Sequence, residues 1–481
     1  MDYFKLLRKI KNKKQEKIFL VIDEKSYTYK EVYNATKLLI NKLRNMKEIN
    51  NYEINEGCKK TVLVYSDDLY FQIIGFFAIN GLEDIPIIAH HNLPQEFLNK
   101  IIENNNIKYV LSDKEFNYIS KKADNLKYEN EFRNYEDEAY KNIFLYEIKS
   151  KIDSIHMKHE ICMGALTSGS TDVPKVLYRT YESWAGFFHI QNEIFNINSD
   201  SKIFINGSLS FTGNLNVIMS VLYEGGSIIS LTEFKCKEWI KIFEEEQVTN
   251  IYLVPSKLKM LNKLIKKQIY SVKGIFTGSE LLFMDTADKL KETFPNSEIK
   301  LYYGASELNY ITYITHEEMY SNPLSVGRPF PNVDIFIKND FIYVNTKYHV
   351  EGITNPCTVY DVGHIDNKGY LIFEGRKDDI INKGGMKISS IKIEAEINKI
   401  SGVKENVVMA YADDKKGNEI VAFVVANIDV TKEYIIKNLK NKIMNVEIPK
   451  KIIFIESIPR NSSGKIDKLF INNIPIFGQT Y

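Results

Sequence analysis

The stretch SYTYKEVYNATKLLINKLRNM, residues 26–46, is followed after a polar segment by TVLVYS, residues 61–66. Apolar residues recur at helical spacing in the first stretch, and the second is a short run of residues that favour strands. Another helical pattern of apolar residues covers residues 70–81. Helix and strand therefore alternate, which is typical of a mostly parallel sheet flanked by helices.

The alternation continues along the chain. Five more short β-rich runs follow, namely KYVLS (108–112), SKIFING (201–207), GGSIISL (225–231), NIYLVP (250–255) and VKGIFTG (272–278). Helical patterns such as residues 231–248 separate them. We therefore expect the α/β fold class, with a large N-terminal domain of parallel-rich sheets that carry helices on their faces.

The pattern of the sequence changes after Asn332. Short strand-like runs with turn residues between them predict a β-rich subdomain at about residues 332–376. Residues 377–481 contain strand-like and helical patterns of their own, enough for a small α+β domain of ordinary size. The sequence thus predicts a large domain over residues 1–376 and a small C-terminal domain over residues 377–481.

Composition excludes several classes of protein. The 481 residues include 63 Lys and Arg against 62 Asp and Glu, a net charge of +1, so no global field exists to gather nucleic acid or an anionic membrane. The four cysteines form no C-x-x-C pair, which disfavours a zinc site and a disulfide framework. No apolar run has the length of a signal-peptide core or a membrane span. We expect a cytoplasmic protein without a nucleic-acid partner or stable membrane insertion.

One polar loop has the composition of a phosphate site. In TSGSTDVPK, residues 167–175, hydroxyl side chains and a glycine precede a single lysine. Backbone N–H groups, hydroxyls and the lysine ammonium are all donors to an anion. The donor residues are Thr167, Ser168, Gly169, Ser170, Thr171 and Lys175. No Gly-Lys-[Ser/Thr] triplet closes the loop, so it is not a Walker-type P-loop, and a polar surface turn fits the loop alone equally well.

Three further segments suit a nucleotide. YYGASE, residues 302–307, combines an aromatic face for a base, a hydroxyl for phosphate and a carboxylate for Mg²⁺. Residues 360–379 indicate a strand, a turn and a second strand, with Asp361 able to accept from both ribose hydroxyls or simply to form a turn. PRNSSGK, residues 459–465, is a polar loop that ends in one lysine and by composition is a linker.

In this order, the four segments resemble the adenylate-forming superfamily of acyl-CoA synthetases, adenylation domains and luciferases, over nearly the whole chain. TSGSTDVPK is similar to the phosphate loop of that superfamily. The resemblance implies that Tyr303 and Gly304 lie at the nucleotide, with the tyrosine ring stacked on adenine. It also implies that Ser306 contacts the α-phosphate and that Glu307 binds Mg²⁺.

The resemblance extends to other positions. It implies ribose binding by Asp361, a nucleotide contact for Arg376, a hinge at Asp378 and a late catalytic lysine at Lys465. The segment TGSEL, residues 277–281, is similar to the superfamily's adenine-pocket segment and adds Gly278, Ser279 and Glu280 as nucleotide-binding residues. Lys383-Gly-Gly385 is similar to the glycine loop used in thioester formation, with Gly384 and Gly385 at the thiol entrance.

The implied reaction consumes ATP with Mg²⁺ and runs in two steps. A carboxylate attacks the α-phosphate and pyrophosphate leaves, which makes positioning and charge neutralisation the main tasks of the protein. Lys465, Glu307 and Ser306 are the implied catalytic residues of this step. The small domain then swings about the hinge, and a thiol of CoA or of the phosphopantetheine on an acyl or peptidyl carrier protein takes the acyl group.

One segment of the sequence bears on the identity of the acid substrate. LSFTGN, residues 209–214, is similar to the Leu-Ser-Phe-Asp segment of amino-acid adenylation domains, but Thr212 replaces the aspartate that pairs with an α-amino group. This disfavours a free α-amino acid and leaves fatty or aryl acids. Thr212, Asn214, Ala305 and Asn309 are candidates for the pocket wall, and ordinary core packing is the alternative for these residues.

Two departures from the superfamily pattern favour a second hypothesis. Asp172 stands where a glycine is usual, which puts a carboxylate near the triphosphate, and Val176 replaces the glycine that usually follows the lysine. A nucleotide-binding regulatory protein with degenerate catalysis is therefore an alternative. An adenylating enzyme that forms no thioester is another.

Overall fold

The computed structural model describes the chain except residues 50–58, 92, 115–142, 149–159, 168–174, 234, 378–379, 384–385, 414–416, 441, 461–465, 468–469, 472–473 and 475–481. The chain divides into two compact units. The first comprises residues 1–311 and 346–354, and the second comprises residues 312–345 and 355–481. This division by compactness does not coincide with the predicted boundary between residues 376 and 377, which stays a prediction.

The first unit carries two sheets and most of the helices. One sheet has the strand order β6-β5-β3-β4-β7-β8. Its strands are β3 (Thr61–Tyr65), β4 (Ile85–Ala89), β5 (Tyr109–Ser112), β6 (Phe144–Glu147), β7 (Ile161–Leu166) and β8 (Val176–Thr180). The other has the strand order β13-β12-β11-β9-β10-β1-β2. Its strands are β1 (Ile18–Ile22), β2 (Lys25–Thr28), β9 (Lys202–Ile205), β10 (Ser227–Ser230), β11 (Asn250–Tyr252), β12 (Gly274–Thr277) and β13 (Glu298–Ala305).

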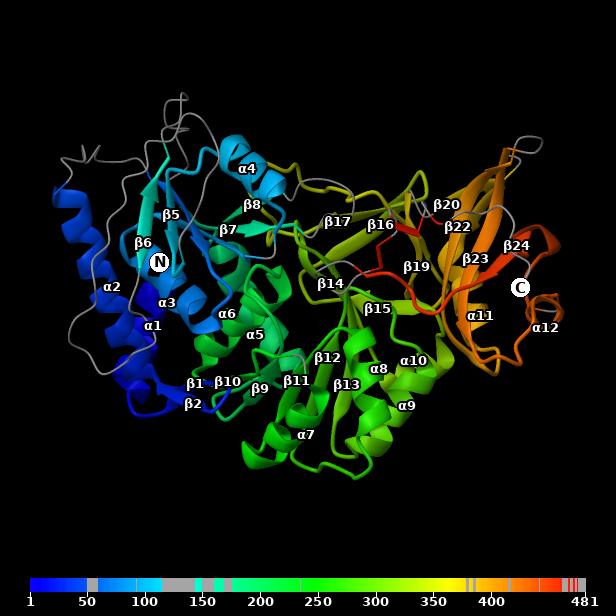
Figure 1. Ribbon diagram of the computed structural model, residues 1–481, viewed down its shortest axis with the longest axis horizontal. Coiled ribbons are helices and arrows are strands. Elements are labelled where there is room, and N and C mark those ends of the chain that lie inside the picture. Colours follow the sequence, from blue (N-terminus) through cyan, green and yellow to red (C-terminus); the bar gives the residue numbers. More distant parts are fainter. Residues whose placement is uncertain are drawn as a thin grey trace. The chain divides into compact units, whose positions relative to one another are not determined.

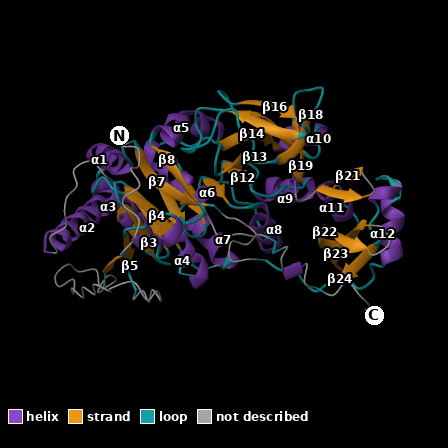
Figure 2. Ribbon diagram, turned by 90° about the horizontal axis from the view of Figure 1, so that it is seen from above, coloured by secondary structure: helices purple, strands orange, loops and turns teal. Residues whose placement is uncertain are grey.

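Helices cover these sheets. Those of the first unit are α1 (Tyr3–Lys14), α2 (Tyr29–Ile49), α3 (Leu69–Gly81), α4 (Gln95–Asn104), α5 (Glu182–Ile194), α6 (Thr212–Glu224), α7 (Cys236–Glu245), α8 (Pro255–Leu264) and α9 (Met284–Thr293). Figure 2 shows β3, β4 and β7 as neighbouring strands, with α1, α2 and α3 gathered on one side of them. No helix among the described residues has the length and apolar character needed to cross a bilayer.

The helix α3 shows why these residues fold as they do. The Asp68 carboxylate accepts from the N–H of Phe71 at 2.7 Å and so caps the first turn. Apolar residues then surround the helix on all sides, and its residues are buried as far as Asn80. Gly75 lies against the sheet, where a Cβ would stand 2.9 Å from a methyl of Val64. The helix therefore packs directly onto β3, and the strands beside it are buried, apolar and parallel.

The second unit is mostly antiparallel. β14 (Asn309–Thr315) leads into it, and the strands β15 (Ser325–Pro329), β16 (Asp334–Lys338), β17 (Phe341–Asn345), β18 (Asp361–Ile365) and β19 (Leu371–Arg376) follow in the order β16-β17-β18-β19-β15-β14. The short helix α10 (His316–Ser321) lies between β14 and β15 in sequence.

The C-terminal part of this unit has its own core. Its elements are β20 (Ile380–Lys383), β21 (Met386–Ser389), α11 (Ser390–Asn398), β22 (Val403–Asp413), β23 (Gly417–Ala426), α12 (Lys432–Leu439), the 3₁₀ turn η3 (Asn445–Glu447) and β24 (Lys451–Phe454). β22, β23 and β24 form one sheet (Figure 1), and an apolar cluster joins it to α11 and α12. The predicted α/β class with a small α+β region at the C-terminal end is confirmed.

Candidate active site

The segment from Tyr303 to Glu307 forms the end of β13 and the turn into β14. The N–H of Leu308 donates to the carbonyl of Ala305 at 3.0 Å, and Asn309 closes the turn with a φ of 68°. This is the geometry of a short hairpin loop that ends in a left-handed residue, a conformation that asparagine tolerates well.

Gly304 makes this turn possible. A Cβ at this position would stand 2.6 Å from the carbonyl oxygen of Asn309, which belongs to the facing backbone and cannot move like a flexible side chain. The two strands therefore approach more closely than any residue with a side chain would allow. This requirement fixes the path of the backbone just before Ser306 and Glu307.

The two tyrosines of the segment have different surroundings. The ring of Tyr302 is buried and packs on Gly278, where a Cβ would stand 2.5 Å from the ring, and its hydroxyl lies 2.9 Å from that of Tyr252. Burial raises the pKa of Tyr302 well above its usual value. Tyr303 is half-buried. Because Tyr302 is enclosed by protein, only the ring of Tyr303 is accessible in this pair. Tyr303 is the residue that the sequence pattern predicts to stack on adenine.

The segment from Gly278 to Glu280 follows β12 and lies beside the N-terminus of α8. Ser279 is exposed and has a φ of 68°. The Glu280 carboxylate accepts from the backbone N–H of Ser256 at 2.9 Å and from its hydroxyl at 3.2 Å. Glu280 therefore caps α8, a structural task that the sequence pattern did not indicate.

Two residues at the base of the predicted phosphate loop lie within the described part of the chain. The N–H of Thr167 donates to the carbonyl of Lys175 at 2.9 Å, and the N–H of Lys175 donates to the Thr167 hydroxyl at 2.9 Å. Lys175 is exposed. The remaining predicted donors, Ser168, Gly169, Ser170 and Thr171, lie outside the described residues, as does Asp172.

The candidate pocket residues are used in different ways. The Thr212 hydroxyl donates to the carbonyl of Leu166 at 3.1 Å, which ties the start of α6 to the end of β7. The Asn214 amide donates to two backbone carbonyls, those of Asn206 and Ser208, so it braces the preceding loop. The Asn309 amide nitrogen is buried and has no hydrogen-bond partner within the described residues.

Asp361 and Arg376 form a separate arrangement in the second unit. They face each other as a direct pair between β18 and β19, and the Arg376 Nε lies 3.9 Å from a carboxylate oxygen of Asp361. The Asp361 side chain is 8% exposed and the Arg376 side chain 65% exposed. The predicted order of strand, turn and strand is confirmed here. Asp378, Gly384, Gly385 and Lys465 lie outside the described residues.

Sequence reasoning missed Arg179. This residue lies in β8, and its side chain is fully buried. Its guanidinium donates to the carbonyl of Ser306 at 2.6 Å, to the carbonyl of Tyr348 at 3.2 Å and to the hydroxyl of Ser183 at 3.3 Å. It also lies over the ring of Trp184, 5.2 Å from the centroid. The sequence does contain one indication of this role, because a charged arginine interrupts the otherwise strand-like run VLYRT, residues 176–180.

A loop about forty residues further along the chain also holds the turn at Glu307. The N–H of Val350 donates to the carbonyl of Glu307 at 2.9 Å, and the N–H of Glu351 donates to the carbonyl of Tyr178 at 2.9 Å. The Glu307 carboxylate itself makes no hydrogen bond or ion pair with the residues that the structure describes. The backbone of Glu307 is therefore fixed by a segment about forty residues further along the chain.

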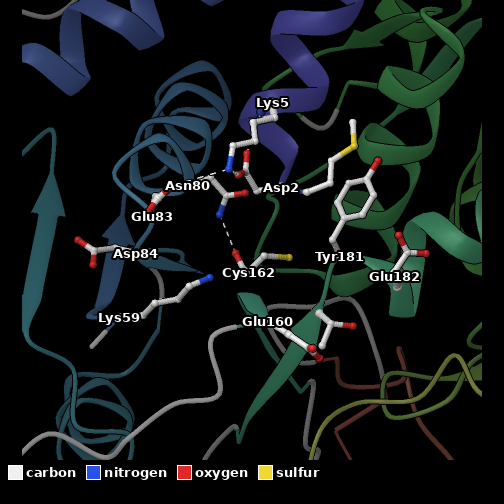
Figure 3. A pocket seen from close by; sticks show the side chains of 12 residues that line it. Asp2, Lys5, Lys59, Asn80, Glu83, Asp84, Glu160, Cys162, Tyr181 and Glu182 are labelled. Carbon is white, nitrogen blue, oxygen red and sulfur yellow. Dashed lines mark hydrogen bonds and ion pairs between the residues drawn. The ribbon is translucent and has the colours of Figure 1, made fainter. Parts of the chain in front are cut away.

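A cavity of about 530 Å³ lies elsewhere in the first unit (Figure 3). Its polar groups largely satisfy one another: Lys5 pairs with Asp2 at 2.9 Å, and the Asn80 amide donates to the carbonyl of Cys162 at 2.6 Å. Burial raises the pKa of the Cys162 thiol to about 12, so it stays protonated at neutral pH. None of the predicted site residues lines this cavity.

Comparison with known families gives matches over most of the chain. The family of AMP-binding enzymes matches residues 7–346, and the AMP-binding enzyme C-terminal domain matches residues 392–465. An uncharacterized acyl-CoA ligase of Bacillus subtilis, YhfT, is 32% identical over 337 residues, which are 66% of this chain and 68% of that protein. A Staphylococcus haemolyticus protein provisionally named long chain fatty acid-CoA ligase VraA is 25% identical over 449 residues, 89% of this chain and 90% of its own.

Solved structures resemble the fold. The o-succinylbenzoate CoA synthetase of Bacillus subtilis, in complex with its acyl-adenylate intermediate, has a TM-score of 0.81 at 18% identity and covers 98% of both chains. The same synthetase with ATP and a magnesium ion has a TM-score of 0.80 at 18% identity, covering 97% of this chain and 99% of its own. At such identities the likeness concerns the fold alone.

Proposed function

Because the chain belongs to the family of AMP-binding enzymes and is an acyl-CoA ligase of the adenylate-forming superfamily, we propose that it joins a fatty or aryl acid to a thiol through an acyl-adenylate. A carboxylate oxygen of the acid attacks the α-phosphorus of ATP, and the bond to pyrophosphate breaks. The thiol then attacks the acyl carbon, AMP leaves, and the thiol proton passes to solvent.

The turn at Ser306 and Glu307 carries this proposal. Its backbone is held from several sides, and the Glu307 carboxylate has no partner among the described residues, so it is free to accept a cation. Carboxylate oxygen suits Mg²⁺, which commonly binds one or two carboxylates together with substrate phosphates. Within the described part of the chain, no group of three or more His, Cys, Asp or Glu residues could hold a metal ion by itself.

Mg²⁺, when bound, would neutralise charge that develops on the phosphate oxygens. Glu307 would hold it, and the Ser306 hydroxyl would donate to the α-phosphate. The half-buried ring of Tyr303 offers a face for adenine. Lys175 would bind the departing pyrophosphate, and Lys465 would donate to the reacting phosphate during the first step. The parts of Asp361 in ribose binding and of Arg376 at the nucleotide rest on the sequence pattern.

Pyrophosphate exchange tests the first half of the proposal. Labelled pyrophosphate should enter ATP only when a carboxylic acid is present, and a panel of short, long and aryl acids would identify the class. ATP binding without exchange under any acid would instead support the regulatory protein that Asp172 and Val176 suggest.

The acceptor is a separate question. Mass spectrometry after incubation with CoA, and in parallel with a phosphopantetheinylated carrier protein, would show which thiol is acylated. Acylation of neither, while the adenylate accumulates, would favour an adenylating enzyme without thioester formation.

A further inference from the structure

Arg179 is a buried cation whose direct partners are neutral. Its guanidinium donates to two backbone carbonyls and one hydroxyl, and within the described residues it forms no ion pair. Burying a charge without an opposite charge in contact is costly unless the surroundings stabilise it. A chain that needed only to fill this space would do so more cheaply with an apolar residue, so the position of the charge requires an explanation.

The partners of Arg179 explain where its charge acts. The shortest hydrogen bond, 2.6 Å, goes to the carbonyl of Ser306, the residue directly before Glu307. The Glu307 carboxylate is close enough to favour the charged form of Arg179. Burial lowers the pKa of Arg179 to about 10, which still leaves the guanidinium protonated at neutral pH. The guanidinium of Arg179 is therefore hydrogen-bonded to the turn that carries the Glu307 carboxylate.

Arg179 also closes a ring of backbone contacts. It reaches the carbonyl of Tyr348, in the loop whose Val350 N–H donates to the carbonyl of Glu307. The same loop returns to β8 through Glu351, which donates to the carbonyl of Tyr178, the neighbour of Arg179. Hydrogen bonds thus join each pair among three segments, namely β8, the loop of residues 346–354 and the turn at Glu307. Arg179 lies in β8, and its guanidinium donates directly to the other two segments.

We propose that Arg179 is a positioning residue for adenylation, which fixes the backbone turn at Ser306 and so holds the Glu307 side chain in place for Mg²⁺. This inference rests on the proposed function, because it takes Glu307 as the ligand of that ion. Arg179 acts through the backbone and the electrostatic field and touches no reacting atom. Arginine suits the task because its planar fork can donate to several carbonyls at once, whereas lysine is a single point charge.

The test compares Arg179→Met, Arg179→Lys and the wild type. Calorimetry would measure the affinity for ATP with Mg²⁺ and with EDTA, and pyrophosphate exchange would be measured across Mg²⁺ concentrations. Arg179→Met should lose about tenfold of the Mg²⁺-dependent affinity and about 10² of the exchange rate, with affinity in EDTA unchanged. Arg179→Lys should restore most of the Mg²⁺ effect and only part of the rate, because charge returns but the fork does not.

Arg328→Gln is the matched control. Arg328 also lies over an aromatic ring, that of Tyr370 at 4.2 Å, and also donates to a backbone carbonyl, that of Lys368 at 3.3 Å. It is exposed, and its substitution should leave the Mg²⁺ dependence unchanged.

Two results would overturn the proposal. One is a folded Arg179→Met variant, judged by circular dichroism, with the Mg²⁺ dependence of the wild type. If that variant does not fold, Arg179→Lys decides, because an unchanged exchange rate at every Mg²⁺ concentration would show that the fork does not position the turn. Absence of exchange in the wild type would instead reject the proposed function, and this inference with it.

Discussion

The two carboxylates that the sequence pattern assigns to the nucleotide are held in opposite ways. Asp361 is buried and faces a mostly exposed arginine across one antiparallel pair of strands. Glu307 lies on a turn whose backbone is held by segments more than a hundred residues before it and about forty after it. Local pairing fixes the first, and distant parts of the chain fix the second. The first carboxylate forms an ion pair with Arg376, and the second forms none with the residues that the structure describes.

Glu307→Gln should have the largest effect on activity. The substitution keeps the size of the side chain and the turn but removes the charge that we propose binds Mg²⁺, so pyrophosphate exchange should fall by about 10²–10³. Its matched control is Glu318→Gln, which alters the capping box of α10 and should cost at most about 1 kcal/mol of stability. Equal losses of exchange in the two variants would contradict a specific role of the Glu307 charge.

Gly304→Ala should have the next largest effect, through the backbone. The new Cβ would meet the carbonyl of Asn309 at 2.6 Å, so the hairpin must open, at a cost of about 1–3 kcal/mol. Gly186→Ala is the control, because this glycine lies inside α5 near side-chain atoms only and alanine favours a helix. Thermal unfolding should show a lower melting temperature for the first variant and an equal or higher one for the second.

Asp361→Asn should reduce ATP affinity by about tenfold, equivalent to about 1.4 kcal/mol, because the amide accepts less strongly from ribose hydroxyls. The fold should tolerate the change, since Arg376 can be solvated by water. Calorimetric titration with ATP and with a 2′-deoxy analogue checks the assignment. If the variant discriminates between the two nucleotides as well as the wild type does, Asp361 does not bind the ribose.

Arg376→Gln should have the smallest effect on stability. An ion pair with one largely exposed partner typically contributes about 0–1 kcal/mol, so urea unfolding should shift little. Any loss of ATP affinity beyond that of the matched Arg328→Gln variant would then report a contact with the nucleotide. A large loss of stability would instead show that this pair, like the turn at Glu307, depends on more than its local partner.

The same contrast explains what the sequence could predict. The alternation of helix and strand around residues 26–81 is a local periodicity, and it correctly predicted the fold class. The strand, turn and strand that pair Asp361 with Arg376 are also close in sequence, so they were predicted too. The hold of Arg179 on Ser306 joins residues 127 positions apart, and no periodicity or spacing reveals it. The cap that Glu280 places on α8 was missed for a similar reason.

The reciprocal bonds between Thr167 and Lys175 have a consequence for how this chain can vary. They join the two ends of the predicted phosphate loop, so a change in the number of residues between them alters mainly the entropy of closing the loop. That entropy changes slowly with length, by about 0.6 kcal/mol for each doubling. Short insertions between the two residues should therefore leave the backbone of Lys175 in place, so the length of this segment can vary without moving the residue that ends it.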